Sequence, residues 1–89
     1  MLTATEKREL KSRAHPLKPV VLIGQRGITD PVLASISEAL DAHQLVKVRL
    51  PAGEKGERSA QASSIAMALN ADEIGVIGRV LILYRKNAG

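Results

Sequence analysis

The feature that most limits the fold of this chain is the alternation of short apolar runs with helical segments along only 89 residues. Pro19–Gly24 is continuously apolar, β-branched and ended by glycine, which is typical of a short buried strand. Leu45–Leu50 alternates apolar with basic side chains, which predicts a strand with one buried and one basic face. Ile74–Ile77 and Val80–Tyr84 are joined by Gly78-Arg79, a pair that favours a type II′ hairpin turn.

Three helices are expected between and before these strands. Thr3 and Glu6 form a capping-box pattern, and Pro16 ends the first helix. Asp30 followed by Pro31 is typical of an N-cap with proline at the first helical position. The expected helices cover about residues 4–14, 30–43 and 57–69.

The resulting order, α-β-α-β-α-β-β, contains two strand–helix–strand crossovers, each of which should be right-handed. If both progress in one direction across the sheet, their helices lie on the same face. We therefore expect an α/β fold with a two-layer sandwich, a four-stranded mixed sheet and an open second face, in a single domain over residues 1–89. The pattern leaves open whether the N-terminal helix covers part of that second face.

The composition excludes several classes of protein. The chain contains no cysteine, so disulfides, zinc–thiolate sites and a cysteine nucleophile are all excluded. No apolar run approaches the ~20 residues that span a bilayer, and the first residues lack the apolar segment of a signal peptide. We expect a cytoplasmic protein with no membrane partner.

The net charge of +4 favours a polyanionic partner, most often nucleic acid. However, proteins that bind single strands by stacking bases need several aromatic rings, and Tyr84 is the only aromatic residue here. The basic excess lies in residues 1–27, on the segment of Lys47 and Arg49, and near the C-terminus. An ordinary solvated surface explains this charge as well as a polyanion site does.

The most specific local feature is Gly24-Gln25-Arg26-Gly27, between the first strand and the second helix. Two glycines three positions apart let the backbone adopt positive φ and let a ligand approach closely. The N–H groups of such a turn suit a phosphate, to which Arg26 and Gln25 add side-chain donors. In KH domains a GxxG loop holds an RNA backbone, although there it joins two helices. A plain strand-to-helix turn is the alternative.

No catalytic or metal-binding constellation is present in the sequence. His15 and His43 lie in different segments without paired ligand spacing, and no serine lies in a nucleophile-elbow motif. The glycine loop matches neither the dinucleotide nor the P-loop pattern. We expect a monomer that is not an enzyme and takes no cofactor, metal or small-molecule substrate.

Two ordered stretches of the chain resemble the CRM domain family, and in particular its free-standing bacterial YhbY-like members. The resemblance covers nearly the whole chain without a large gap. The first stretch carries Leu10-Lys11, Ala14-His15, Leu17, Pro19-Val20, Ile23-Gly24 and Gly27-Ile28-Thr29; the second carries Val76-Ile77-Gly78, Leu81 and Leu83-Tyr84-Arg85.

The resemblance implies a fold similar to the C-terminal domain of translation initiation factor three, with sheet order 1-2-4-3 and the last strand antiparallel. It also implies RNA binding, since bacterial members are associated with precursors of the large ribosomal subunit and plant members with group II intron splicing. By matching position, the family's RNA-binding loop corresponds to Gly24, Gln25, Arg26 and Gly27.

We therefore expect a ribosome assembly factor that binds large-subunit ribosomal RNA through its backbone and shape. Basic residues around the loop would add to the site: Lys11, Arg13, Lys18, Lys47, Arg49 and Arg85. One alternative is a protein-docking module that uses the acidic second helix, with Asp30, Glu38 and Asp41, or the sheet face. Another is a small basic protein that binds duplex DNA.

Overall fold

The computed structural model describes residues 2–86. These residues form seven elements in the expected order: α1 (Ala4–Ala14), β1 (Pro19–Leu22), α2 (Asp30–His43), β2 (Leu45–Arg49), α3 (Lys55–Ala68), β3 (Asp72–Ile77) and β4 (Val80–Tyr84). Both α3 and β3 begin two residues earlier than the sequence pattern predicted. The single domain expected over residues 1–89 includes residues 1 and 87–89, which lie outside the described part.

The first two helices each begin after a threonine whose hydroxyl caps the N-terminus. At α1, Thr3 and Glu6 form the expected capping box: the Glu6 N–H donates to Thr3 Oγ1 (3.1 Å), and the Thr3 N–H donates to Glu6 Oε1 (3.0 Å). The hydrogen bond from the Thr3 backbone, aided by the Thr3 side chain, lowers the pKa of Glu6. At α2 the expected N-cap, Asp30, was wrong by one residue. Thr29 is the N-cap, because its hydroxyl accepts the N–H of Val32 at 3.3 Å.

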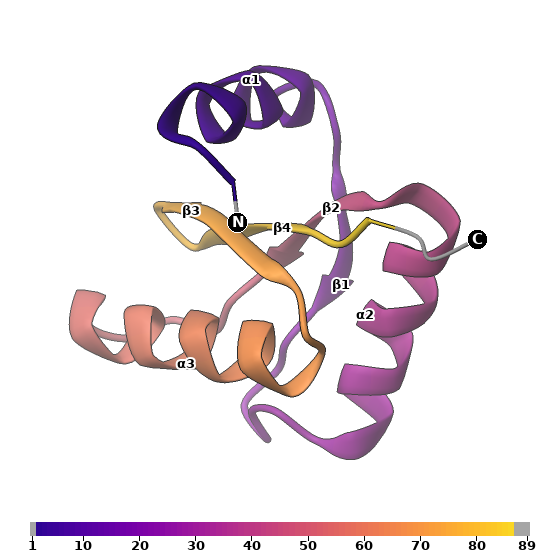
Figure 1. Ribbon diagram of the computed structural model, residues 1–89. Coiled ribbons are helices and arrows are strands. Elements are labelled where there is room, and N and C mark those ends of the chain that lie inside the picture. The colour runs from indigo at the N-terminus through magenta and orange to yellow at the C-terminus, as the bar shows by residue number, and fades with distance from the viewer. Residues whose placement is uncertain (1, 87–89) are drawn as a thin grey trace.

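The strands form one mixed sheet in the order β1-β2-β4-β3, which confirms the expected order. β1 and β2 are parallel, and β4 is antiparallel to both of its neighbours. The hairpin from β3 to β4 turns at Gly78, whose φ of +60° fits the expected type II′ turn. Figure 1 shows α2 and α3 on one side of the sheet and α1 on the other.

The main core lies between the sheet and the helices α2 and α3, which share one face as the crossover rule predicted. It is entirely aliphatic, so it needs no buried polar partners and depends on close packing. Its largest fully buried side chains are Ile36 and Leu40 from α2, Ile65 from α3, Val46 and Val48 from β2, Leu50 just after it, and Leu81 and Leu83 from β4.

A second, smaller cluster forms where α1 packs on the opposite face. Leu10 and Ala14 from α1 contact Leu45, Ile74 and Ile82 from the sheet. The register of β3 with β4 shifts between residues 73 and 75, so an extra residue is inserted there, as in a β-bulge. The N-terminal helix therefore covers part of the second face, which the sequence pattern had left open.

Candidate nucleic-acid interface

The loop of residues 24–27 is a tight turn at the carboxyl ends of the parallel strands β1 and β2. The N–H of Gly27 donates to the carbonyl oxygen of Gly24 at 3.0 Å, which places Gln25 and Arg26 at the exposed tip. Just before the turn, the N–H of Ile23 donates to the carbonyl oxygen of Arg49 at 2.9 Å. The tip thus extends from a paired strand, and its two polar side chains are free to meet a ligand.

Only one of the two glycines in the turn is required by its backbone conformation. Gly27 adopts a φ of +76°, a left-handed conformation that glycine tolerates without steric cost. Gly24 does not have a positive φ, so our expectation of one at both glycines holds only for Gly27. A Cβ built on Gly24 would meet nothing within 4 Å. Within the described residues, neither backbone conformation nor crowding explains a glycine at position 24. Because glycine has no side chain, the backbone at this position is open to an approaching ligand.

A hollow of about 470 Å³ lies beside the turn. One of the residues that line it, Arg79, is basic and was not predicted from the sequence as a site residue. Arg79 lines this hollow together with the turn, the segment after β2 and Gln61 of α3. Its backbone is fixed there because the N–H of Leu50 donates to the carbonyl oxygen of Arg79 at 2.6 Å. The order 1-2-4-3 could have revealed this position, since an antiparallel β4 must begin where β2 ends.

Lys47 and Arg49 point to the sheet face that carries α1, as their alternation with buried Val46 and Val48 predicted. Their surroundings differ. Lys47 is half-buried, and its Nζ donates to the carbonyl oxygens of His15 and Leu17 at 3.1 Å each. It therefore ties the connection between α1 and β1 to the sheet. Arg49 is exposed.

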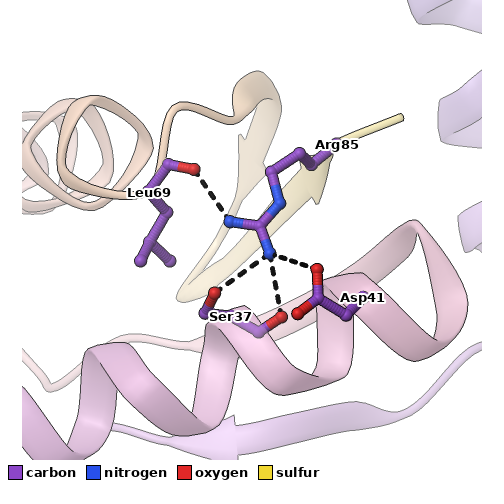
Figure 2. A network of polar contacts seen from close by, with 4 residues as sticks. All are labelled: Ser37, Asp41, Leu69 and Arg85. Atoms are coloured by element: carbon purple, nitrogen blue, oxygen red, sulfur yellow. Dashed lines mark hydrogen bonds and ion pairs between the residues drawn. The ribbon is translucent and has the colours of Figure 1, made fainter. Parts of the chain in front are cut away.

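Arg85 does not join Lys47 and Arg49 on one basic surface, contrary to our expectation. Figure 2 shows its guanidinium between α2 and the end of α3, the two helices that lie on the opposite side of the sheet from α1 in Figure 1. Nη1 donates to the carbonyl oxygen of Leu69 at 2.9 Å, and Nη2 donates to the carbonyl oxygen and hydroxyl of Ser37 at 3.0 Å each. An ion pair of 2.9 Å to Asp41 completes the network, and 21% of the Arg85 side chain is exposed. The planar fork of arginine here connects two helices to β4.

The remaining basic residues lie along α1 and after it. Lys11 lies over Gly75, since a Cβ there would come within 2.7 Å of the Lys11 Cε. Lys11 and Lys47 line one groove of the sheet face, whereas Arg13 and Lys18 line another near the start of β1. The structure thus groups four of the expected residues in two pairs, whereas Arg49 lines neither groove and Arg85 lies on the other side of the sheet.

Within residues 2–86, no group of three or more His, Asp or Glu side chains is placed to hold a metal ion. Over the same residues, no helix is long and apolar enough to cross a membrane.

The chain matches the family model of the CRS1/YhbY (CRM) domain over residues 2–85. It belongs to this family. Among the relatives, "Probable RNA-binding protein PA4753" of Pseudomonas aeruginosa is 37% identical over 97% of this chain and 83% of its own length. "Probable RNA-binding protein YqeI" of Bacillus subtilis is 31% identical over 98% of this chain and 91% of its own.

A solved structure from another bacterium is similar to this chain over its length. The solution structure of the hypothetical protein SAV1595 of Staphylococcus aureus, described as a candidate RNA-binding protein, superimposes with a TM-score of 0.89. The two chains are 29% identical, and the match covers 100% of this chain and 93% of the other. The two chains thus share one fold across a large sequence difference.

The two loop glycines should respond differently to alanine. Gly27→Ala should lower the free energy of unfolding by about 1–2 kcal/mol, because alanine is strained in the left-handed region. Gly24→Ala should change it by no more than about 0.5 kcal/mol, since the added methyl group has open space. Urea unfolding of both variants checks this. Equal losses would contradict the difference between the two glycines.

Arg85 should matter for stability more than an exposed arginine does. Arg85→Lys removes the fork that reaches two helices and should cost about 1–3 kcal/mol, because Ser37 and Leu69 lose their donor. The matched control is Arg49→Lys, the same change at an exposed position of the same sheet. Thermal and urea unfolding compare the two. A stable Arg85→Lys variant would show that the network in Figure 2 contributes little.

Proposed function

We propose that this protein binds structured RNA without catalysis and acts on the precursor of the large ribosomal subunit. The observation that carries the proposal is the turn of residues 24–27. The tip of the turn is exposed, and Arg79 lies beside it. Nothing in the fold requires a glycine at position 24, where a side chain would have open space around it. Backbone N–H groups and an arginine in such a turn suit phosphate oxygens. Membership of the CRM family and relatives named as RNA-binding proteins support RNA as the polyanion.

In this mechanism the turn and its basic neighbours hold the RNA backbone. The hydroxyl of Thr29 already satisfies one donor at the start of α2, so the anion meets the turn itself rather than the helix end. Arg26, between the two glycines, and Arg79, beside the turn, supply charge. Lys11, Arg13, Lys18 and Arg49 extend it over the α1 side of the sheet. Binding would release counterions from the RNA. The protein would act as a monomer in the cytoplasm.

Reversing the charge at the tip should weaken RNA binding. Arg26→Glu should lower the affinity for a large-subunit ribosomal RNA fragment by about tenfold or more, because attraction to a phosphate becomes repulsion. The slope of log affinity against log salt should also become shallower, by about 0.7–0.9 for each phosphate that the variant no longer neutralises. Filter binding or fluorescence anisotropy at several salt concentrations measures both.

The control is Lys86→Glu, which makes the same charge change at an exposed position beyond the end of β4 that lies away from the turn. It should leave affinity within about threefold of the parent, since a distant exposed charge is screened by salt. If Arg26→Glu binds as tightly as Lys86→Glu, the loop does not bind the RNA. A salt-independent affinity would favour protein docking, and preferential binding of duplex DNA in direct competition would favour the DNA alternative.

In cells, crosslinking followed by sequencing of the bound RNA should recover sites in large-subunit ribosomal RNA that still carry precursor sequence. The expected sites should cluster, and an Arg26→Glu strain should lose them while its protein level stays unchanged. Recovery of messenger RNA alone, or of mature ribosomal RNA spread evenly over both subunits, would overturn the assignment to large-subunit assembly.

A further inference from the structure

Part of the sheet face that carries α1 is uncovered, and it exposes apolar side chains. The apolar contacts of α1 with the sheet are made by Leu45, Ile74 and Ile82. Outside these contacts, Leu22 on β1 is 69% exposed and Ile77 on β3 is 62% exposed. Single exposed aliphatic side chains are ordinary on a protein surface, whereas a contiguous apolar patch can mark a binding site. The arrangement of these side chains therefore decides between the two.

The strand register places these side chains in one line. Leu22 pairs with Arg49, Arg49 pairs with Val80, and Val80 pairs with Ile77. The line crosses the whole sheet, from β1 at one edge to β3 at the other, and Arg49 stands in it between aliphatic neighbours. Val80 is partly buried, and the other three side chains are exposed. We call these four residues the uncovered row.

The charges around the uncovered row are positive. Lys47 lies in the adjacent row, opposite Ile82, and Lys11 lies over Gly75 in the same row. Neither row contains a carboxylate. An occupant of this surface should therefore be anionic and should also present a flat or apolar face to the aliphatic side chains.

The uncovered row is also continuous with the loop. Leu22 is followed by Ile23 and then by Gly24, the first residue of the turn. Its partner Arg49 ends β2 beside the same turn, because its carbonyl oxygen accepts the N–H of Ile23. An RNA strand whose phosphates meet the turn would pass directly over this row.

We propose that the uncovered row receives an unpaired RNA base. The base would lie on the Arg49 guanidinium, whose plane stacks on aromatic rings, and between the aliphatic side chains of Leu22, Val80 and Ile77. This inference rests on the proposed function, and it adds a preference to it: the protein should favour RNA with a bulge or loop over a perfect duplex. In this site the planar Arg49 guanidinium would stack on the base, as an aromatic ring does in other RNA-binding proteins.

The test compares two RNAs of nearly equal charge. One is a fully paired stem, and the other is the same stem with a three-nucleotide bulge that contains 2-aminopurine. The parent should bind the bulged stem about tenfold more tightly, in the range expected for stacking of one base. Its binding should also change the 2-aminopurine fluorescence.

Two variants should remove this preference. Leu22→Ser/Ile77→Ser should bind both stems with the affinity that the parent shows for the paired stem, without a fluorescence change. Arg49→Lys keeps the charge but loses the plane, and should reduce the preference several-fold. The matched control is Met67→Ser on α3, a side chain that is 83% exposed and does not lie on the sheet face. Urea unfolding verifies that each variant is folded.

Each outcome separates this inference from the proposed function. If Leu22→Ser/Ile77→Ser binds the bulged stem like the parent, the uncovered row is not a base site. The same result is expected if the row binds a protein partner. If that variant weakens both stems equally, the row contacts backbone and the base site is also wrong. If the parent binds neither stem, or Arg26→Glu leaves binding to both unchanged, the failure lies in the proposed function itself.

Discussion

The strand on which the rest of the structure depends is β4. It is inserted antiparallel between β2 and β3, and its three central residues, Leu81, Ile82 and Leu83, are buried. Leu81 and Leu83 belong to the core under α2 and α3, whereas Ile82 belongs to the cluster under α1. Side chains of β4 therefore pack in both apolar clusters, together with those of β2, whose Leu45 lies under α1 and whose Val46 and Val48 lie in the main core. The same insertion brings the β3–β4 turn, and Arg79 with it, to the candidate loop.

The net charge overstates how much positive surface is available to a polyanion. Lys47 and Arg85 both donate to backbone carbonyls of other elements. Lys47 does so at the end of α1, and Arg85 does so at the end of α3 and along α2. Helix ends leave carbonyls without partners, and long basic side chains are well suited to bind them. Two residues that charge patterning assigns to a ligand thus take part in holding the fold together.

Local patterns predicted the elements well because each depends on neighbours in sequence: the capping box at Thr3, the alternation of Leu45–Leu50 and the turn at Gly78 are all short-range features. The order of the strands came from the resemblance to the CRM family. Local errors were small, such as the shift of the α2 N-cap by one residue to Thr29. The errors in placing basic residues concern partners that are distant in sequence. Arg85 meets Ser37 across 48 positions, and the place of Arg79 depends on how β4 pairs with β2. Composition and periodicity carry no information about such pairs.

The single aromatic residue restricts how this fold can bind a base. Tyr84 packs at the margin of the α1 cluster, so its ring is not part of the uncovered row. A guanidinium flanked by aliphatic side chains offers one planar surface, whereas proteins that read single strands combine several rings. Most of the affinity would then come from phosphates at the turn, and one base would contribute selectivity for unpaired RNA rather than for sequence. Such a division fits the function proposed above, in which backbone interactions supply most of the affinity for a structured RNA.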